Sequence, residues 1–143
     1  EPFFIMCEGG TIDWAAHDNR TMSMVNDVIS FDQAIKVAYE FYLKHKDETL
    51  IIVTADHETG GLTLGAGSST INWDELERQW ISTDRKDVTD YDTNRRHNKS
   101  CSIGWTTGSH TGGAVPVFAI GKGAEKFNGR IDNTDIKGKI LGE

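Results

Sequence analysis

The run of residues 50–53, LIIV, constrains the fold more than any other feature of this chain. It is short, apolar without alternation and rich in β-branched residues, which is typical of a strand buried on both faces in a parallel sheet. Residues 3–7, FFIMC, predict another buried strand, and a helix between the two would complete a βαβ unit. Because this first strand begins within two residues of Glu1, we expect the chain to be part of a longer protein.

The helix is predicted over about residues 31–46. Ser30 and Gln33 form a capping box, in which the serine oxygen accepts from the Gln33 amide and the Gln33 side chain reaches back to the Ser30 amide. Apolar residues follow with a period of about 3.6 residues, and the segment ends in basic residues. A further strand is predicted at residues 115–120, VPVFAI. We therefore assign the α/β class, with a partial sheet flanked by helices.

The segment between the second and third predicted strands has a different composition. Residues 65–69 form a loop rich in glycine and serine, and Asn72 begins a second capping box that predicts a short helix. Residues 84–100 are strongly polar, so we expect a surface excursion rather than core. The predicted organisation is one unit over the whole chain, with a surface insertion at about residues 65–104.

Composition excludes several classes of partner. The 143 residues are 37% hydrophobic and 26% charged, which fits one soluble globular unit. Asp and Glu number 22 against 15 Lys and Arg, for a net charge of -7, so no nucleic acid is expected as a partner. No apolar run approaches the length of a membrane span, so no membrane is expected either. Only Cys7 and Cys101 are present; one disulfide is possible, and we favour two free thiols.

Residues able to carry chemistry follow the first predicted strand. Glu8 lies at its carboxyl end, where open α/β sheets bind ligands. Asp13 and His17 are four positions apart, so on a helix both side chains leave one face and could hold one metal ion. Such pairs are also common as surface or helix-capping residues, so this pair needs support from elsewhere in the chain.

A second pair follows the second predicted strand. Asp56 and His57 are adjacent, in a turn that Gly60 and Gly61 loosen. Adjacent residues of a regular strand point to opposite faces, so an irregular turn is needed to aim both side chains at one ion. Taken alone, Asp56 could equally be a helix cap and His57 a loop residue.

His110 is flanked by glycines shortly before the third predicted strand. Together with Asp13 and His17, it would supply three nitrogen or oxygen ligands to zinc and leave a fourth position open. That arrangement is typical of catalytic rather than structural zinc, because the open position can take an oxygen of a substrate.

Three strings connect these residues to a known family. EGGTIDWAAH, TADHETGG and GSHTGGAVPVFAIG occur in this order and closely resemble the alkaline phosphatases of the bacterial and animal type. The resemblance runs from about Phe3 to Gly121 and on to residues 132–135, with the polar middle matching least. It identifies residues 1–143 as the C-terminal portion of an alkaline phosphatase domain.

The resemblance implies a site with two Zn²⁺ and one Mg²⁺, in which the chemical types of the residues fit their ions. One zinc would be held by Asp13, His17 and His110. The second zinc would be held by Asp56 and His57. Glu8 would be a magnesium ligand, and Trp14 an aromatic wall rather than a ligand.

The family hydrolyses phosphate monoesters through a phosphoserine, and the resemblance implies this reaction for the longer protein. In the family the nucleophilic serine stands in an Asp-Ser-Ala context, which does not occur in this chain. That serine and a phosphate-binding arginine are expected upstream. Ser109, in a glycine-rich turn, is assigned a backbone role. We therefore predict that this chain alone is inactive.

Two alternatives stay open. A phosphodiesterase or nucleotide pyrophosphatase of the same superfamily shares the two-zinc ligands, although Glu8 favours a magnesium site, which the diesterases lack. The chain could also be a non-catalytic metal-binding fragment. Because the family is commonly dimeric and exported, the resemblance implies a homodimer that is periplasmic or secreted.

Overall fold

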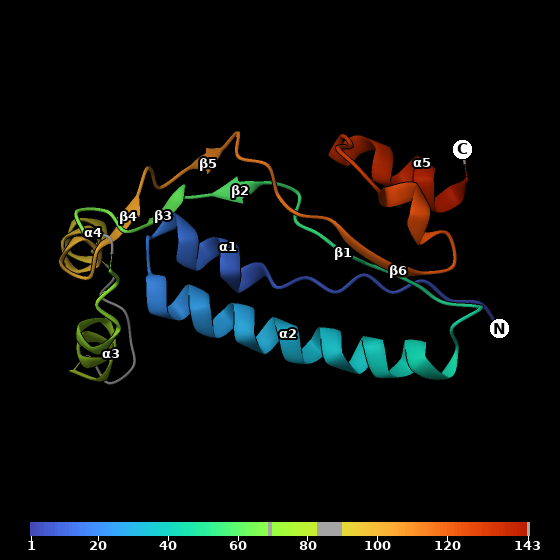
Figure 1. Cartoon of the computed structure of the whole chain (residues 1–143), viewed down its shortest axis with the longest axis horizontal. Helices are drawn as coiled ribbons and strands as arrows, with labels where there is room; N and C mark the ends of the chain where they lie inside the picture. Colours follow the sequence, from blue (N-terminus) through green and yellow to red (C-terminus); the bar gives the residue numbers. More distant parts are fainter. Residues whose placement is uncertain (69, 83–89, 143) are drawn as a thin grey trace. The chain divides into compact units, whose positions relative to one another are not determined.

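The computed structural model describes residues 1–68, 70–82 and 90–142 (Figure 1). Its contacts divide into a first unit, Glu1–Phe31 with Thr59–Thr111, and a second unit, Asp32–Glu58 with Gly112–Glu143. The elements in chain order are α1 (Gly10–His17), α2 (Thr21–Lys44), β1 (Leu50–Val53), β2 (Glu58–Thr59), β3 (Leu62–Leu64), α3 (Trp73–Ser82), α4 (Tyr91–Ser100), β4 (Ile103–Trp105), β5 (His110–Thr111), β6 (Phe118–Gly121), η1 (Ala124–Phe127), η2 (Asn133–Asp135) and α5 (Ile136–Leu141). This mixture of helices and short strands confirms the α/β class.

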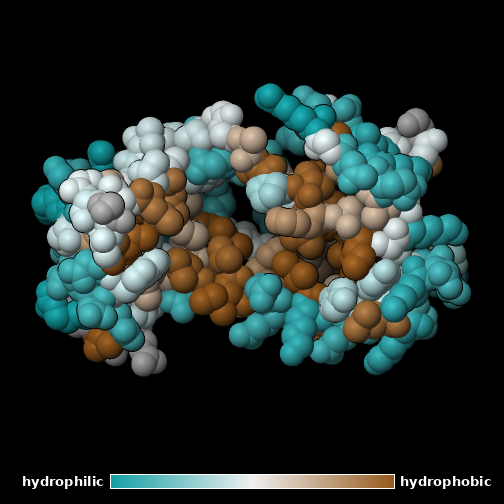
Figure 2. Space-filling view, viewed as in Figure 1, coloured by the Kyte–Doolittle hydropathy of each residue, from teal (hydrophilic) through white to brown (hydrophobic). Residues whose placement is uncertain are grey.

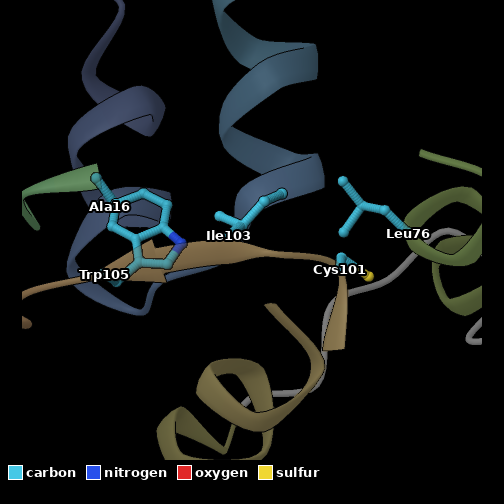
Figure 3. Packing of buried hydrophobic residues seen from close by; sticks show 5 residues of the cluster. All are labelled: Ala16, Leu76, Cys101, Ile103 and Trp105. Atoms are coloured by element: carbon cyan, nitrogen blue, oxygen red, sulfur yellow. The ribbon is translucent and has the colours of Figure 1, made fainter. Parts of the chain in front are cut away.

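The first unit contains the hydrophobic core of the described residues. β4 runs antiparallel to β3, and its side chains pack against α1 and α3 (Figure 3). The cluster consists of Ala16, Leu76, Cys101, Ile103 and Trp105. Because Ala15 and Ala16 are buried, one side of α1 is held against the protein and its other side is turned outward. The core thus fixes the helix that carries two of the predicted ligands.

The second unit is built on the antiparallel pair of β1 and β6, which lie side by side as a ribbon (Figure 1). Leu50 pairs with Gly121 at one end, and Val53 pairs with Phe118 at the other. The last part of α2 belongs to this unit, and the Tyr42 ring lies beside Gly121. Gly121 has φ +101°, and a Cβ there would come within 2.1 Å of the Thr49 carbonyl oxygen, so only glycine fits this turn.

The predicted strands are confirmed in part. Residues 50–53 form β1 as expected, but β1 is half-buried and antiparallel to its neighbour, so the expected parallel sheet is wrong. The strand predicted at 115–120 begins at Phe118. Residues 3–7 form no strand and are exposed. A strand exists only through hydrogen bonds to a neighbour, and in the described part of the chain no strand pairs with this segment.

The predicted start of the long helix is wrong. α2 begins at Thr21 rather than near residue 31, and it ends at Lys44, close to the predicted end. Ser30 is therefore an interior residue, and its hydroxyl donates to the Asn26 carbonyl oxygen (2.9 Å) instead of capping a helix. Serine can make this bond to the carbonyl oxygen four residues earlier when it lies inside a helix, so the capping pattern does not by itself fix where a helix begins.

One of the two hydrogen bonds of the second capping box is confirmed. The Asn72 side chain accepts from the Glu75 amide (3.1 Å) at the start of α3. The Glu75 carboxylate does not return the contact, because it accepts from Arg78 (2.6 and 2.8 Å) and Gln79 (2.7 Å). These hydrogen bonds, first that of Arg78, lower the pKa of Glu75 to about 2.

The polar run at 84–100 is more than a surface excursion. Residues 83–89 lie outside the described part of the chain, but α4 follows them, and its Asn94 and Asn98 are buried. Side-chain amides can be buried where hydrogen-bond partners meet them, which polarity alone does not reveal. The boundaries of an insertion at about 65–104 stay a prediction.

Both cysteines are free thiols, as favoured from the sequence. Cys7 is exposed, whereas Cys101 is buried in the core, and this burial raises the pKa of its thiol. Within the described ranges, none of the helices combines the length and the apolar character that crossing a bilayer requires.

Candidate metal centre

Helix α1 places Asp13 and His17 on its outward side. Each side chain is about a third exposed, and the His17 Nε2 atom lies 3.4 Å from the Asp13 Oδ2 atom. The four-residue spacing brings both to one face, as expected from the helical period. Ala15 and Ala16 between them point into the protein and hold the helix in place.

His110, on β5, lies close to Asp13 and His17, although it is more than 90 positions later in the sequence than His17. Its Nε2 atom lies 3.2 Å from the Nε2 atom of His17 and 3.9 Å from the Asp13 Oδ1 atom. Two imidazole nitrogens and a carboxylate therefore meet at one partly exposed position. Nitrogen and oxygen donors of this kind are the usual ligands of Zn²⁺.

A backbone contact sets the tautomer of His17. Its Nδ1 atom lies 2.7 Å from the Gly108 carbonyl oxygen, which can only accept, so Nδ1 carries the hydrogen. In the neutral ring, Nε2 then presents a lone pair toward His110. Two imidazole nitrogens in such close contact need a proton or a cation between them. A histidine that binds a metal through one ring nitrogen usually donates from its other ring nitrogen, here Nδ1, to a carbonyl or carboxylate oxygen. The donor set thus fits zinc.

The approach of the Gly108 turn to α1 depends on glycine. A Cβ at position 108 would come within 2.9 Å of the His17 carbonyl oxygen and 3.1 Å of the Tyr91 ring. Backbone and ring would have to move apart to admit it, and the contact to the His17 imidazole would lengthen. Gly108 is therefore needed for the orientation of His17.

Thr59 supports Asp13 in a way that the sequence did not reveal. The Thr59 hydroxyl donates to the Asp13 Oδ1 atom at 2.6 Å. This bond orients the carboxylate and leaves Oδ2 directed toward His17. Thr59 lies in the string TADHETGG, but nothing in its spacing relates it to a residue 46 positions earlier.

We expect Thr59→Val to weaken zinc binding by about 10- to 100-fold, the range typical of lost hydrogen bonds to metal ligands. Valine keeps the shape of threonine but cannot donate to Asp13. Competition with a chromogenic chelator measures the affinity. Thr59→Ser, which keeps the hydroxyl, should bind zinc nearly as the wild type does; equal affinity of the valine and wild-type proteins would contradict the supporting role.

A buried polar network holds the connection between α1 and α2. Trp105 Nε1 donates to the Thr21 hydroxyl (2.9 Å), which donates to the Asn98 Oδ1 atom (2.6 Å). The Asn98 amide donates to the Asn19 carbonyl oxygen (2.7 Å), and the Asn19 amide donates to the carbonyl oxygens of Ala16 (2.9 Å) and Thr107 (2.9 Å). The network connects the end of α1 to the loop that leads to His110, so it helps to hold His17 and His110 at a fixed distance from each other.

The second predicted pair lies in the second unit. Asp56 and His57 stand in the irregular turn after β1, as expected, and the His57 Nε2 atom lies 3.4 Å from the Asp56 Oδ2 atom. The Asp56 side chain is exposed, and its carbonyl oxygen accepts from the Asn133 side chain (3.0 Å). Two donors side by side could share one cation.

Glu8 and Trp14 are both exposed residues of the first unit. Glu8 is exposed in the segment before α1, and among the described residues no hydrogen bond or ion pair joins it to Asp13, His17 or His110. Trp14 is also exposed, on α1. Ser109 contributes to its turn through the backbone: its amide donates to the Thr107 hydroxyl (3.1 Å) and its carbonyl oxygen accepts from Gly60 (3.0 Å).

Comparison with known proteins connects this geometry to one family. The sequence model described as "Alkaline phosphatase" matches residues 1–141. The chain is similar to alkaline phosphatase 4 of Bacillus subtilis, with 38% identity over 93% of this chain and 37% of the relative. It spans about two fifths or less of the Bacillus relatives that it matches, the second being alkaline phosphatase 3 at 39% of its length.

Solved structures agree with this similarity. A cold-active alkaline phosphatase from a psychrophilic Shewanella species superposes with a TM-score of 0.79 at 29% identity, over 94% of this chain and 44% of that one. A variant of the TAB5 alkaline phosphatase, solved with bound Mg, has a TM-score of 0.71 at 38% identity, over 98% of this chain and 35% of that one.

Proposed function

The chain belongs to the alkaline phosphatase family, and from this premise we propose that it supplies metal ligands to an enzyme that hydrolyses phosphate monoesters. The observation that carries the proposal is the meeting of Asp13, His17 and His110 in the first unit. The chemistry of these donors fits zinc, and their partial exposure leaves room for a ligand from solution.

The proposed ligands divide by ion. Asp13, His17 and His110 would hold one zinc, and the neighbouring side chains Asp56 and His57 would hold a second. These two groups are supported by the short distances within each of them. Glu8 would be a ligand of magnesium, supported by its oxygen donor and by the family resemblance.

When bound, such divalent ions stabilise negative charge on phosphate oxygens and ease the ionisation of a nucleophile. They would also answer an electrostatic problem, because a chain of net charge -7 would otherwise repel a phosphate dianion. The chain's own groups prepare this chemistry. Gly108 holds the proton of His17 on Nδ1, and Thr59 orients Asp13, so that His17 Nε2 and Asp13 Oδ2 are the atoms that would face an ion.

The nucleophile of the reaction is proposed to be a serine outside this chain. The serine would take the phosphoryl group from the monoester and release the alcohol. Water would then attack the phosphorus of the phosphoserine, releasing phosphate and restoring the serine. A phosphate-binding arginine would also come from elsewhere. The backbone role of Ser109 in its turn supports this division. We therefore expect negligible turnover by the chain alone. The homodimer and the periplasmic or secreted location stay predictions.

A chimeric enzyme tests the proposed function. In alkaline phosphatase 4 of Bacillus subtilis, the segment that matches this chain would be replaced by the chain itself. We expect the chimera, with zinc and magnesium, to hydrolyse a chromogenic phosphate monoester, whereas the isolated chain does not. His110→Ala should abolish the activity of the chimera. His45→Ala is the control and should leave the activity unchanged, because His45 is exposed and lies outside the proposed ligands.

Three outcomes would contradict this assignment. Robust turnover by the isolated chain would show that no outside serine is needed. A preference of the chimera for diesters would favour the phosphodiesterase alternative. Weak zinc binding by the isolated chain that His110→Ala leaves unchanged, together with an inactive chimera, would favour a fragment without catalysis.

A further inference from the structure

The donor atoms of the first unit have the spacing that a tetrahedral ion requires. The Nε2 atoms of His17 and His110 lie 3.2 Å apart, and His17 Nε2 lies 3.4 Å from Asp13 Oδ2. Zn²⁺ binds nitrogen at about 2.0–2.1 Å in tetrahedral geometry, so two of its ligand atoms lie about 3.3–3.4 Å apart. Octahedral ligands at the same bond length would lie about 2.9 Å apart. The observed spacing therefore fits zinc, and the fold must hold it.

Asn19 connects the two segments that carry the histidines. Its side-chain amide donates to the carbonyl oxygens of Ala16 (2.9 Å) and Thr107 (2.9 Å). The Ala16 carbonyl belongs to the peptide group that precedes His17, and the Thr107 carbonyl belongs to the peptide group that precedes Gly108. The Gly108 carbonyl oxygen in turn accepts from His17 Nδ1 (2.7 Å). One side chain thus fixes the backbone on both sides of the His17 imidazole.

Asn19 is buried and adopts a left-handed backbone conformation. The residue is 0% exposed, and its φ is +53°. Glycine would adopt this conformation without strain and would leave no polar side chain to bury. The Asn19 Oδ1 atom is buried, and none of the described residues donates to it. A buried acceptor without a partner is unfavourable, so the turn alone does not account for asparagine, whereas its two donated hydrogen bonds do.

The hydrogen bonds of Asn19 lie beneath a polar surface. Figure 2 shows hydrophilic residues at the surface in the region where Figure 1 draws α4, yet Asn98 of this helix is 4% exposed. The Asn98 amide donates to the Asn19 carbonyl oxygen (2.7 Å), and the Thr21 hydroxyl donates to Asn98 Oδ1 (2.6 Å). Hydrogen bonds away from water are stronger, and a fully connected network is rigid. The contacts of Asn19 are thus suited to setting the distance between two ligands.

We propose that Asn19 is a positioning residue of the zinc centre, which selects zinc by holding His17 and His110 at the spacing that an ion of this size requires. The inference rests on the proposed zinc centre. Asn19 itself touches neither ion nor substrate. When its amide hydrogen bonds are lost, α1 and the loop before His110 can move apart, and the two nitrogens can adopt the wider spacing of a larger ion. Loss of Asn19 therefore changes the choice of ion and not only the affinity for it.

Competitive titration of the 143-residue chain with Zn²⁺ and Cd²⁺ tests this role. Cd²⁺ has the charge and the filled d shell of Zn²⁺ but is larger, so the ratio of the two affinities reports the spacing of the donors. Asn19→Gly keeps the left-handed turn and removes both amide hydrogen bonds. We expect it to weaken zinc binding and to leave the cadmium affinity nearly unchanged, so that the preference for zinc falls by about 10- to 100-fold.

Leu76→Ala is the control for a general loosening of the first unit. Leu76 is 4% exposed in the core cluster, so its truncation leaves a cavity without removing a hydrogen bond of Asn19. Amide exchange in β4 should accelerate in this variant, while the ratio of zinc to cadmium affinity stays that of the wild type. A residue with a structural role alone would behave as Leu76 does.

The wild-type chain provides a measurement that does not depend on the folding of a variant. Because both amide hydrogens of the Asn19 side chain are donated in a buried place, they should exchange slowly with water in nuclear magnetic resonance spectra, with and without zinc. The side-chain amide of Asn26 is the reference, since it donates to the Met22 carbonyl oxygen (2.7 Å) in an exposed position and should exchange faster.

Three results would overturn the inference and leave the zinc centre in place. One is a folded Asn19→Gly variant that keeps the wild-type preference for zinc. Another is an equal loss of zinc and cadmium affinity in this variant, because Asn19 would then act on stability alone. A third is exchange of the Asn19 side-chain amide as fast as that of Asn26. A wild-type chain that binds no zinc would instead remove the proposed centre, and the inference with it.

Discussion

Replacing His17 by alanine is expected to lower the zinc affinity of the chain by at least about 100-fold, because even the loss of a hydrogen bond to a metal ligand costs about 10- to 100-fold. His17 is central to the cluster, since its Nε2 atom approaches both Asp13 (3.4 Å) and His110 (3.2 Å). Calorimetric titration of the purified chain with Zn²⁺ at neutral pH measures the effect. The tight site should disappear from the titration of the variant.

His45→Ala is the matched control for this titration. His45 is exposed just beyond the end of α2 and stacks on Phe41, so its loss removes an imidazole without touching the cluster. The control variant should bind zinc as the wild type does. If His17→Ala and His45→Ala reduced the affinity equally, zinc would be binding to surface histidines in general, and the proposed centre would be wrong.

The second large effect is expected for Trp105→Ala, which should destabilise the first unit by about 3–5 kcal/mol. The Trp105 side chain is 7% exposed, belongs to the core cluster and donates from Nε1 to Thr21 (2.9 Å). Its removal leaves a cavity and unties the network that runs through Asn98 to the end of α1. Hydrogen exchange of the β4 amides should accelerate by at least about 100-fold. Zinc affinity should also fall, because the two histidines lose their common support.

Trp73→Ala makes the same chemical change at the surface. Trp73 is 54% exposed at the start of α3, and its replacement should alter stability by about 0.5 kcal/mol or less. Equal acceleration of exchange in the two variants would mean that the cluster around Trp105 is not the stabilising core of this unit.

Some site residues could be predicted because their relation is local. Asp13 and His17 share one face of α1 through a four-residue spacing, and Asn72 caps α3 through a contact three residues along the chain. Helical period and capping depend on neighbours in sequence, so they are readable without the fold. Long-range contacts have no such signature. Thr59 and Gly108 support Asp13 and His17 from 46 and 91 positions away, and their types alone suggested only a turn.

The errors of prediction have a similar origin. An apolar run predicts that β1 is a strand, but the direction of its neighbour depends on which segment reaches it, and β6 returns antiparallel. The polar helix α4 looked like surface, yet Asn98 is buried because Thr21 and Asn19 meet its amide. Hydropathy records the cost of burying a polar group but not the partners that offset it.

The amino-acid sequence by itself determined the family, through three ordered strings, and the types of donor at each candidate position. It also determined β1 and the pairing of Asp13 with His17 on one helix. Only the tertiary structure decided that His110 meets this pair, which tautomer His17 adopts, and that Asn98 is buried. The physical reason is that period and composition act between neighbours, whereas convergence and burial depend on segments that only folding brings together.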